Sequence, residues 1–168
     1  MKTYMLRFRS YVKSAWSPKY WLVRVPAFLF LFLLFVASNF LPALEFEGQS
    51  ISGLMALVFG WAGIVVGHVA WFANIAWGIG HFLFLLGLDT IAFVVSLVTG
   101  VLALSALYTL PAFGSFSYPA MGARQTHDFI GYEWGFWLWL LSMLGFTLAA
   151  FLLVLIRFMG VQSVSSEP

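Results

Sequence analysis

Long apolar segments without charged side chains constrain this chain more than any other feature. The segment 25–44 contains twenty residues and no charge, and two further uncharged runs cover 51–88 and 90–109. About 20 apolar residues in a helix cross the hydrocarbon core of a bilayer, which is about 30 Å thick. Hydrophobic residues make up 62% of the chain and charged residues 8%, whereas soluble domains average roughly 45–50% and about 25%. A domain of this size cannot bury so much apolar surface, and we therefore expect an all-α integral membrane protein.

Positive charge is concentrated before the first apolar segment. Six of the eight Lys and Arg residues lie in the first 24 positions, and only Arg124 and Arg157 follow. Because cations beside a span stay in the cytoplasm, the N-terminus is predicted to be cytoplasmic. Residues 1–24 also contain several aromatic side chains, so this segment is expected to lie at the inner interface and contact anionic lipid headgroups. The sequence pI of about 9.1 therefore indicates lipid rather than nucleic acid as the partner.

The spacing of the apolar runs predicts one transmembrane domain, residues 25–159, folded as a four-helix bundle and followed by a cytoplasmic tail at 160–168. The run 51–88 is too long for one span. It is predicted to hold a short interfacial or re-entrant helix, about 52–66, followed by a span, and two spans joined near residues 67–68 are the alternative. The four transmembrane helices are predicted at about 25–44, 69–86, 90–109 and 134–158.

Four spans return the C-terminus to the cytoplasm together with Arg157. Asp89 is predicted to cap the helix that follows it. The segments 44–66 and 111–133 then form an extracytoplasmic surface. Most of the acidic side chains fall on this surface: Glu45, Glu47, Asp128 and Glu133.

The residue types that usually support catalysis or transport are missing. The sequence contains no cysteine, which excludes disulfides, thiolate metal ligands and cysteine nucleophiles. No predicted span carries Asp, Glu, Lys or Arg near its middle, although proton-coupled and ion-coupled transport depends on such residues. The chain also lacks P-loop, HExxH and GxSxG patterns. We therefore predict a non-enzymatic protein with no cofactor.

Two of the three histidines lie in or beside the predicted second span. His68 and His81 are 13 residues apart, which separates them by about 20 Å and about 140° on a helix, so they cannot bind one metal together. His68 could approach His127 in the outer loop and hold a metal or a haem with Asp128 or Glu133. Ordinary roles, as an interfacial polar residue and a solvated loop residue, are the alternative for these two histidines.

His81 is predicted to lie deeper, in the inner half of the bilayer. A neutral imidazole there needs a hydrogen-bond partner, and Ser96, Thr99 or Ser142 on another helix is expected to supply it. A quinone or haem site at His81 is the alternative.

Small residues recur at helical spacing in two places. Gly63 with Gly67, and Gly145 with Ala149, have the small-xxx-small pattern that lets helices approach closely. Packing within the chain is the expected use of this pattern, and contact with a partner's helix is the alternative.

Trp71 and Asn74 lie near the start of the predicted second span. They could line a ligand groove. The alternative is an aromatic belt at the membrane interface, where tryptophan is common.

Four short motifs follow one another along the chain: Leu41-Pro42-Ala43-Leu44, Gly60-Trp61, Ala70-Trp71-Phe72-Ala73-Asn74 and Trp137-Leu138-Trp139-Leu140. With these motifs, the sequence resembles a family of small four-span bacterial inner-membrane proteins without an assigned function. The resemblance implies a four-span topology and a bacterial inner membrane, and it implies no activity.

Two classes of function are open from the sequence, and a third is disfavoured. The first is a non-enzymatic interaction protein that acts through helix–helix and outer-loop contacts, either as an accessory subunit or as an immunity protein against a membrane-targeted toxin. The second is a membrane protein that binds haem, quinone or metal through His68, His81 or His127. A small channel or carrier is disfavoured because the spans lack ionisable residues.

Overall fold

A computed structural model describes residues 18–66, 68–112, 115–120 and 123–164. Most of this part is helical. The α-helices are α2 (Pro18–Phe40), α3 (Gly53–Phe59), α4 (Phe72–Leu85), α5 (Asp89–Ala112) and α6 (Trp134–Val164), and η1 (Gly60–Val66) is a 3-10 helix. The strands are β1 (Pro42–Phe46), β2 (Gln49–Ser52), β3 (Ser115–Ala120) and β4 (Ala123–Tyr132).

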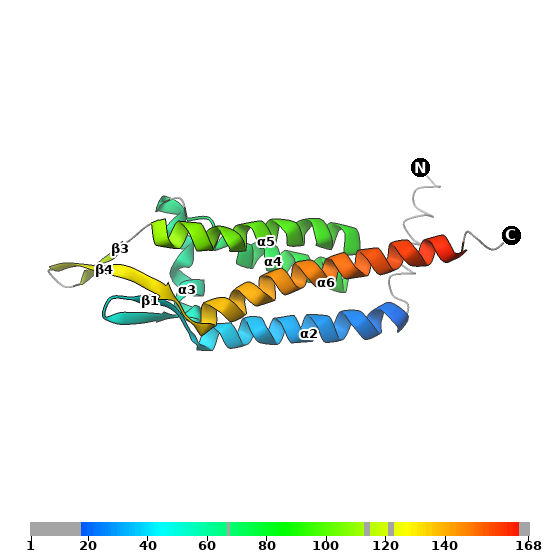
Figure 1. The fold of residues 1–168 in the computed structure, drawn as a ribbon, viewed down its shortest axis with the longest axis horizontal. Coiled ribbons are helices and arrows are strands. Elements are labelled where there is room, and N and C mark those ends of the chain that lie inside the picture. Colours follow the sequence, from blue (N-terminus) through cyan, green and yellow to red (C-terminus); the bar gives the residue numbers. More distant parts are fainter. Residues whose placement is uncertain (1–17, 67, 113–114, 121–122, 165–168) are drawn as a thin grey trace.

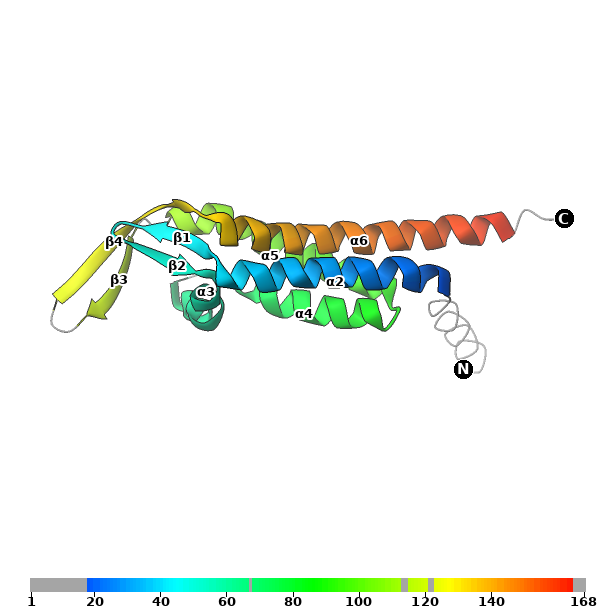
Figure 2. The same ribbon diagram turned by 90° about the horizontal axis from the view of Figure 1, so that it is seen from below.

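The four longer helices lie side by side along the longest axis of the molecule (Figure 1). Helix α2 packs on α6, α6 on α5, and α5 on α4. The start of α2 and the end of α6 lie at one end of this bundle, and the strands lie at the other (Figure 1). We call these the terminal end and the sheet end. Helix α3 and η1 lie against the sheet end of α4 (Figure 2).

Three helices are long and apolar enough to cross a membrane: Tyr20–Phe40, Asp89–Pro111 and Trp134–Met159. These correspond to the predicted first, third and fourth spans. Helix α4 has 14 residues, about 21 Å, which is shorter than the hydrocarbon core. The structure therefore supports a membrane protein with three helices of spanning length, and it does not confirm that α4, the predicted second span, crosses the membrane.

The segment around α4 is longer than the α-helix itself. Three backbone bonds of 3.0 Å, from the N–H groups of residues 72–74 to the carbonyls of residues 69–71, form a tight turn before α4. At the other end Gly87 has φ +77°. The Gly87 and Leu88 N–H groups donate to the carbonyls of Phe84 and Leu83, which is the pattern that ends a helix at a left-handed glycine. Helical turns thus cover nearly the whole predicted segment 69–86.

The first predicted span is shifted along the chain. Its helix begins at Pro18 and ends at Phe40, and residues 42–46 form strand β1 instead of the last helical turn. Arg24 consequently lies inside the helix. The predicted interfacial helix 52–66 is divided between α3 and η1.

The prediction of an all-α fold is wrong at the sheet end, where a four-stranded antiparallel sheet has the order β2-β1-β4-β3. Gly48 takes φ +80° in the turn between β1 and β2. Strand β1 then pairs with β4, with Leu44 opposite Tyr132 and Glu45 opposite Gly131. The two outer pairings of the sheet join consecutive strands in segments that were predicted only as extracytoplasmic surface, and its central pairing joins two segments that lie far apart in the chain, which local sequence patterns cannot show.

Much of the helical surface is apolar and exposed. Large side chains such as Phe30, Leu33 and Val101 point away from the bundle, and in the apolar window of α2 only 17% of residues are buried. Small residues and a few large ones fill the interior, among them Ala73, Ala103 and Phe146. Lipid is the environment that would cover the outward side chains.

Candidate functional site

A cavity of about 710 Å³ lies at the sheet end of the bundle, between the helices, the sheet and the α3–η1 segment. We call it the sheet-end cavity. Its lining is mostly apolar, with a few polar side chains from α2, α4 and α6 and the turn before α4. Four residues singled out in the sequence line it: Gly63, His68, Trp71 and Asn74.

Trp71 and Asn74 belong to a hydrogen-bond chain that crosses three elements. The Trp71 indole donates to the Leu57 carbonyl of α3 at 2.7 Å. The Asn74 amide donates to the Trp71 carbonyl at 3.0 Å, and its oxygen accepts from the Trp139 indole of α6 at 2.8 Å. The spacing of three residues places Trp71 and Asn74 on one side of the helix. The chain of bonds therefore connects α3, α4 and α6 around the cavity.

His68 lies half-buried in the cavity wall. Its Nδ1 is 3.2 Å from Thr109 Oγ1 of α5, and the same hydroxyl donates to the Ser105 carbonyl at 2.9 Å. Because a hydroxyl has one hydrogen, the Thr109 oxygen is placed to accept from His68 Nδ1–H. Burial lowers the pKa of His68, so its imidazole stays neutral at pH 7.

His81 lies elsewhere, inside the bundle, with 3% of its surface exposed. Its ring centroid is 4.0 Å from that of Trp77 and 3.9 Å from that of Phe146. Its Nδ1 is 3.0 Å from the Trp77 carbonyl of the same helix. Within the part of the chain that the structure describes, its Nε2 has no hydrogen-bond partner. The structure thus keeps His68 and His81 apart.

The prediction that His81 forms a hydrogen bond with a hydroxyl of another helix is wrong. The hydroxyls of Ser96, Thr99 and Ser142 each donate to a carbonyl of their own helix, at 2.7, 3.0 and 2.8 Å. Short hydroxyl side chains readily bond back to the preceding turn. The rings of Trp77 and Phe146 pack against the His81 ring instead.

His127 lies on β4, where its Cα is opposite that of Phe116. Its side chain is outside the described part of the molecule, so the predicted approach of His127 to His68 stays a prediction. Among the residues that the structure describes, no three His, Asp or Glu side chains gather closely enough to hold a metal ion.

The small residues have different surroundings. A Cβ on Gly63 would lie 3.0 Å from His68 Cβ, so this glycine permits the turn before α4 to fold back on η1. A Cβ on Gly145 would lie 2.6 Å from Leu31 Cδ2, which brings α6 close to α2. Ala149 packs on the core. Gly67 lies outside the described residues.

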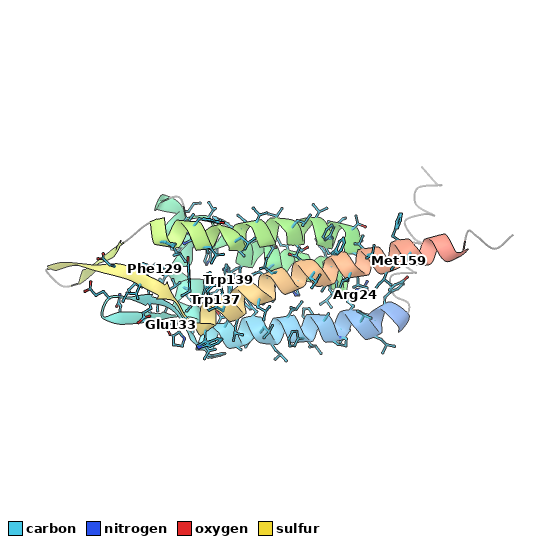
Figure 3. All side chains as sticks on the ribbon, in the orientation of Figure 1. Arg24, Phe129, Glu133, Trp137, Trp139 and Met159 are labelled. Atoms are coloured by element: carbon cyan, nitrogen blue, oxygen red, sulfur yellow. The ribbon has the colours of Figure 1, made fainter. Side chains whose placement is uncertain are left out.

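A second, open hollow of about 560 Å³ lies where the sheet meets α6. It is lined by two carboxylates and three aromatic side chains: Glu45, Tyr132, Glu133, Trp134 and Trp137. We call it the acidic hollow. The Tyr132 and Trp137 rings meet at 5.9 Å and 68°, and Figure 3 shows Glu133 and Trp137 close to the start of α6. The carboxylates were predicted to lie on the extracytoplasmic surface, but no sequence pattern indicated that the aromatic side chains lie beside them.

The Tyr132 hydroxyl of this hollow points into the bundle and donates to the Ala106 carbonyl at 2.9 Å. Burial raises its pKa. Ser50 donates to Glu133 at 2.9 Å, which connects the β2 edge of the sheet to the start of α6.

A buried charge cluster closes the terminal end. Asp89 accepts from Arg24 at 2.8 and 3.1 Å and from Arg157 at 2.5 Å. Arg24 and Asp89 are fully buried, and Arg157 is nearly so. From the sequence, Arg24 was predicted to belong to the basic interfacial segment, Asp89 to cap a helix and Arg157 to lie on the cytoplasmic side. One signal was available, since Asp89 is the only acidic residue between Glu47 and Asp128 and the predicted topology places it on the side of both arginines.

No protein-family model matches this chain, and comparison with curated proteins and with solved structures also gives no match.

Proposed function

We propose that the protein is a four-span, non-enzymatic membrane protein that binds a protein partner on its extracytoplasmic side. The binding surface is the sheet platform, which consists of the strands β1–β4. The observation that carries the proposal is the pairing of β1 with β4. It joins the two segments that precede α4 and α6 into one surface.

In this proposal α4 is the second span. Its 14 residues are extended by the turn at 69–71, and a short span is accommodated by local thinning of the bilayer. The start of α2 and the end of α6 share the terminal end (Figure 1), which agrees with both chain ends in the cytoplasm. Arg24 and Arg157 lie there, as expected for the positive side. The resemblance noted above makes a bacterial inner membrane the proposed location.

The chemistry of the acidic hollow suggests a partner with an exposed lysine or arginine. Glu45 and Glu133 provide negative charge, and Tyr132, Trp134 and Trp137 provide aromatic faces to which a cation is attracted. Trp134 is 76% exposed, and exposed tryptophans often contribute a large part of the binding energy at interfaces. Such a partner fits both of the proposed roles, a larger membrane assembly that this chain accompanies or a toxin that it neutralises.

Co-purification tests the proposal. The full-length protein is extracted from its native membrane in mild detergent, and stoichiometric polypeptides are identified by mass spectrometry. We expect one basic polypeptide with the wild type, and at least tenfold less of it with the double variant Glu45→Gln, Glu133→Gln. The isosteric change removes charge and keeps shape.

A matched pair of aromatic variants locates the contact. Trp134→Ala should weaken recovery of the partner, whereas Phe158→Ala, an exposed aromatic at the other end of α6, should leave it unchanged. The absence of any stoichiometric polypeptide, or equal recovery with all variants, would contradict the proposal.

Binding of haem or quinone at His81 is a second candidate, and one observation favours it. The buried Nε2 of His81 has no hydrogen-bond partner among the described residues, and a buried imidazole nitrogen in that state is available as a ligand. An absorption spectrum of the purified protein decides whether haem is bound, and mass spectrometry of its organic extract decides whether a quinone is bound. A Soret band that is lost in His81→Ala would support it, and a spectrum of protein alone would exclude the haem.

A further inference from the structure

We propose that the sheet-end cavity binds an acyl chain of a membrane phospholipid. This inference concerns a different surface from the acidic hollow and does not depend on the existence of a protein partner.

The size and lining of the cavity suit a hydrocarbon chain. Its volume of about 710 Å³ falls within the range of roughly 300–1,000 Å³ that is typical of ligand pockets. Side chains from β1, β2, α5 and α6 contribute apolar walls: Leu44, Phe46, Ile51, Leu110 and Phe136. A wall of this kind favours an apolar occupant over a polar one.

The polar side chains in the wall are already engaged. The Trp71 and Trp139 indoles donate to Leu57 and Asn74, and His68 contacts Thr109. A polar ligand would have to replace these bonds, because a buried polar group is costly without a partner. A hydrocarbon chain needs no such replacement.

The α3–η1 segment forms one wall and lies close against the bundle at two points. A Cβ on Gly53 would lie 2.2 Å from the Ser38 carbonyl oxygen of α2, and a Cβ on Gly60 would lie 2.7 Å from Trp71 Cδ1. The two glycines thus hold the segment against the bundle at its start and in its middle. The cavity lies between this segment and the helices.

The rim indicates the source of the chain. Met55 and Phe59 line the cavity and are 52% and 62% exposed. Helix α3 has no buried residue, and Leu54 and Val58 are also half exposed. A rim of exposed apolar side chains beside membrane-spanning helices faces lipid, so an occupant enters from the bilayer and not from water. Phospholipid is the hydrocarbon-bearing molecule that surrounds every membrane protein.

Photo-crosslinking tests the inference. The full-length protein is placed in vesicles of phosphatidylethanolamine and phosphatidylglycerol that contain a phosphatidylglycerol with a diazirine in its acyl chain. After irradiation, labelled residues are identified by mass spectrometry. We expect label inside the cavity, on residues such as Leu110 and Phe136, in addition to the lipid-facing surface.

Two substitutions on the same helix provide the comparison. Ala56 lines the cavity and Val58 does not. Ala56→Trp should fill the cavity and reduce labelling of Leu110 and Phe136 at least fivefold, whereas Val58→Trp should change it less than twofold. Ala62→Trp, also on the lining, is the substitute if Ala56→Trp does not elute as a single folded species.

Two results would overturn the inference. Label confined to outward residues such as Leu54 and Val58 would mean ordinary lipid contact without a binding site. Cavity labelling by a diazirine-bearing prenyl chain, without labelling by the phospholipid, would assign the cavity to an isoprenoid instead.

Discussion

The two ends of the helix bundle are stabilised by different chemistry. At the terminal end, one carboxylate and two guanidinium groups join α2, α5 and α6 inside the protein. At the sheet end, neutral hydrogen bonds among Trp71, Asn74 and Trp139 connect the elements around a cavity. A buried charge that loses its partner is far more costly than a neutral group that does so. The terminal end therefore fixes the positions of three helices, whereas the sheet end leaves a cavity between its elements.

The largest expected effect comes from the charge cluster. Asp89→Asn removes the carboxylate and leaves the buried Arg24 and Arg157 side chains without a counter-charge. We expect a loss of about 3–5 kcal/mol in the free energy of unfolding, measured by SDS titration from mixed micelles. The exposed Asp128→Asn is the control and should change stability by less than about 0.5 kcal/mol. A loss below about 1 kcal/mol for Asp89→Asn would remove the contrast between the two ends.

A smaller effect is expected at the sheet end. Asn74→Leu breaks the bond from the Trp139 indole and leaves that donor beside the cavity. We expect a loss of about 1–3 kcal/mol, measured in the same titration. Ser50→Ala, which removes an exposed bond to Glu133, should cost less. An equal loss of unfolding free energy for Asn74→Leu and Asp89→Asn would mean that the neutral hydrogen bonds of the sheet end stabilise the fold as much as the charge cluster does.

The pH dependence of the free energy of unfolding tests whether His68, which lies before α4, is buried in its neutral form. Burial lowers its pKa below the usual value of about 6.5 for histidine. As the pH falls below 6.5, the unfolded chain binds a proton that the folded state excludes, so stability decreases at low pH. The decrease attributable to His68 is at most about 1.4 kcal/mol per pH unit. Unfolding between pH 7.5 and 5.5 should be less pH-dependent in His68→Gln than in the wild type, and equal slopes would contradict a buried neutral His68.

The smallest effect concerns the turn between β1 and β2. Gly48 has φ +80° and open space around its Cβ position. Gly48→Ala should therefore cost about 1 kcal/mol for backbone reasons alone. Gly131 on β4 also has open space but no positive φ, so Gly131→Ala is the matched control and should be nearly neutral. Thermal unfolding followed by circular dichroism is sensitive enough for this comparison, and an equal cost for both variants would rule out the backbone explanation.

The sequence predicted the helical elements better than their connections. Apolar runs identified the helices that begin near residues 90 and 134 within one or two residues, because length and hydropathy are local properties. The sheet was missed because Leu44 and Tyr132 become neighbours only in the folded chain. The charge cluster was missed for the same reason, since Arg24, Asp89 and Arg157 each have an ordinary local explanation.

The candidate site was predicted in part. Trp71 and Asn74 were proposed as groove residues and line the sheet-end cavity. Their hydrogen-bond chain depends on Leu57 and Trp139, which no local pattern connects with them. The predicted hydrogen-bond partners of His81 were wrong, because the sequence cannot show that the serine and threonine hydroxyls donate to carbonyls of their own helices.

The pairing of β1 with β4 has a consequence for biosynthesis. Phe46 and its partner Phe129 are separated by about 80 residues, so roughly 4–16 s of translation pass before the second strand emerges at ~5–20 residues per second. Arg157 of the charge cluster is made later still. During this interval one edge of the β1–β2 hairpin has no β4 to pair with, and Asp89 has only Arg24. The strands of the sheet are therefore all made before the last helix, and the charge cluster is completed only when that helix reaches Arg157. A chain that stops after β4 thus has all four strands of the sheet end and an incomplete terminal end.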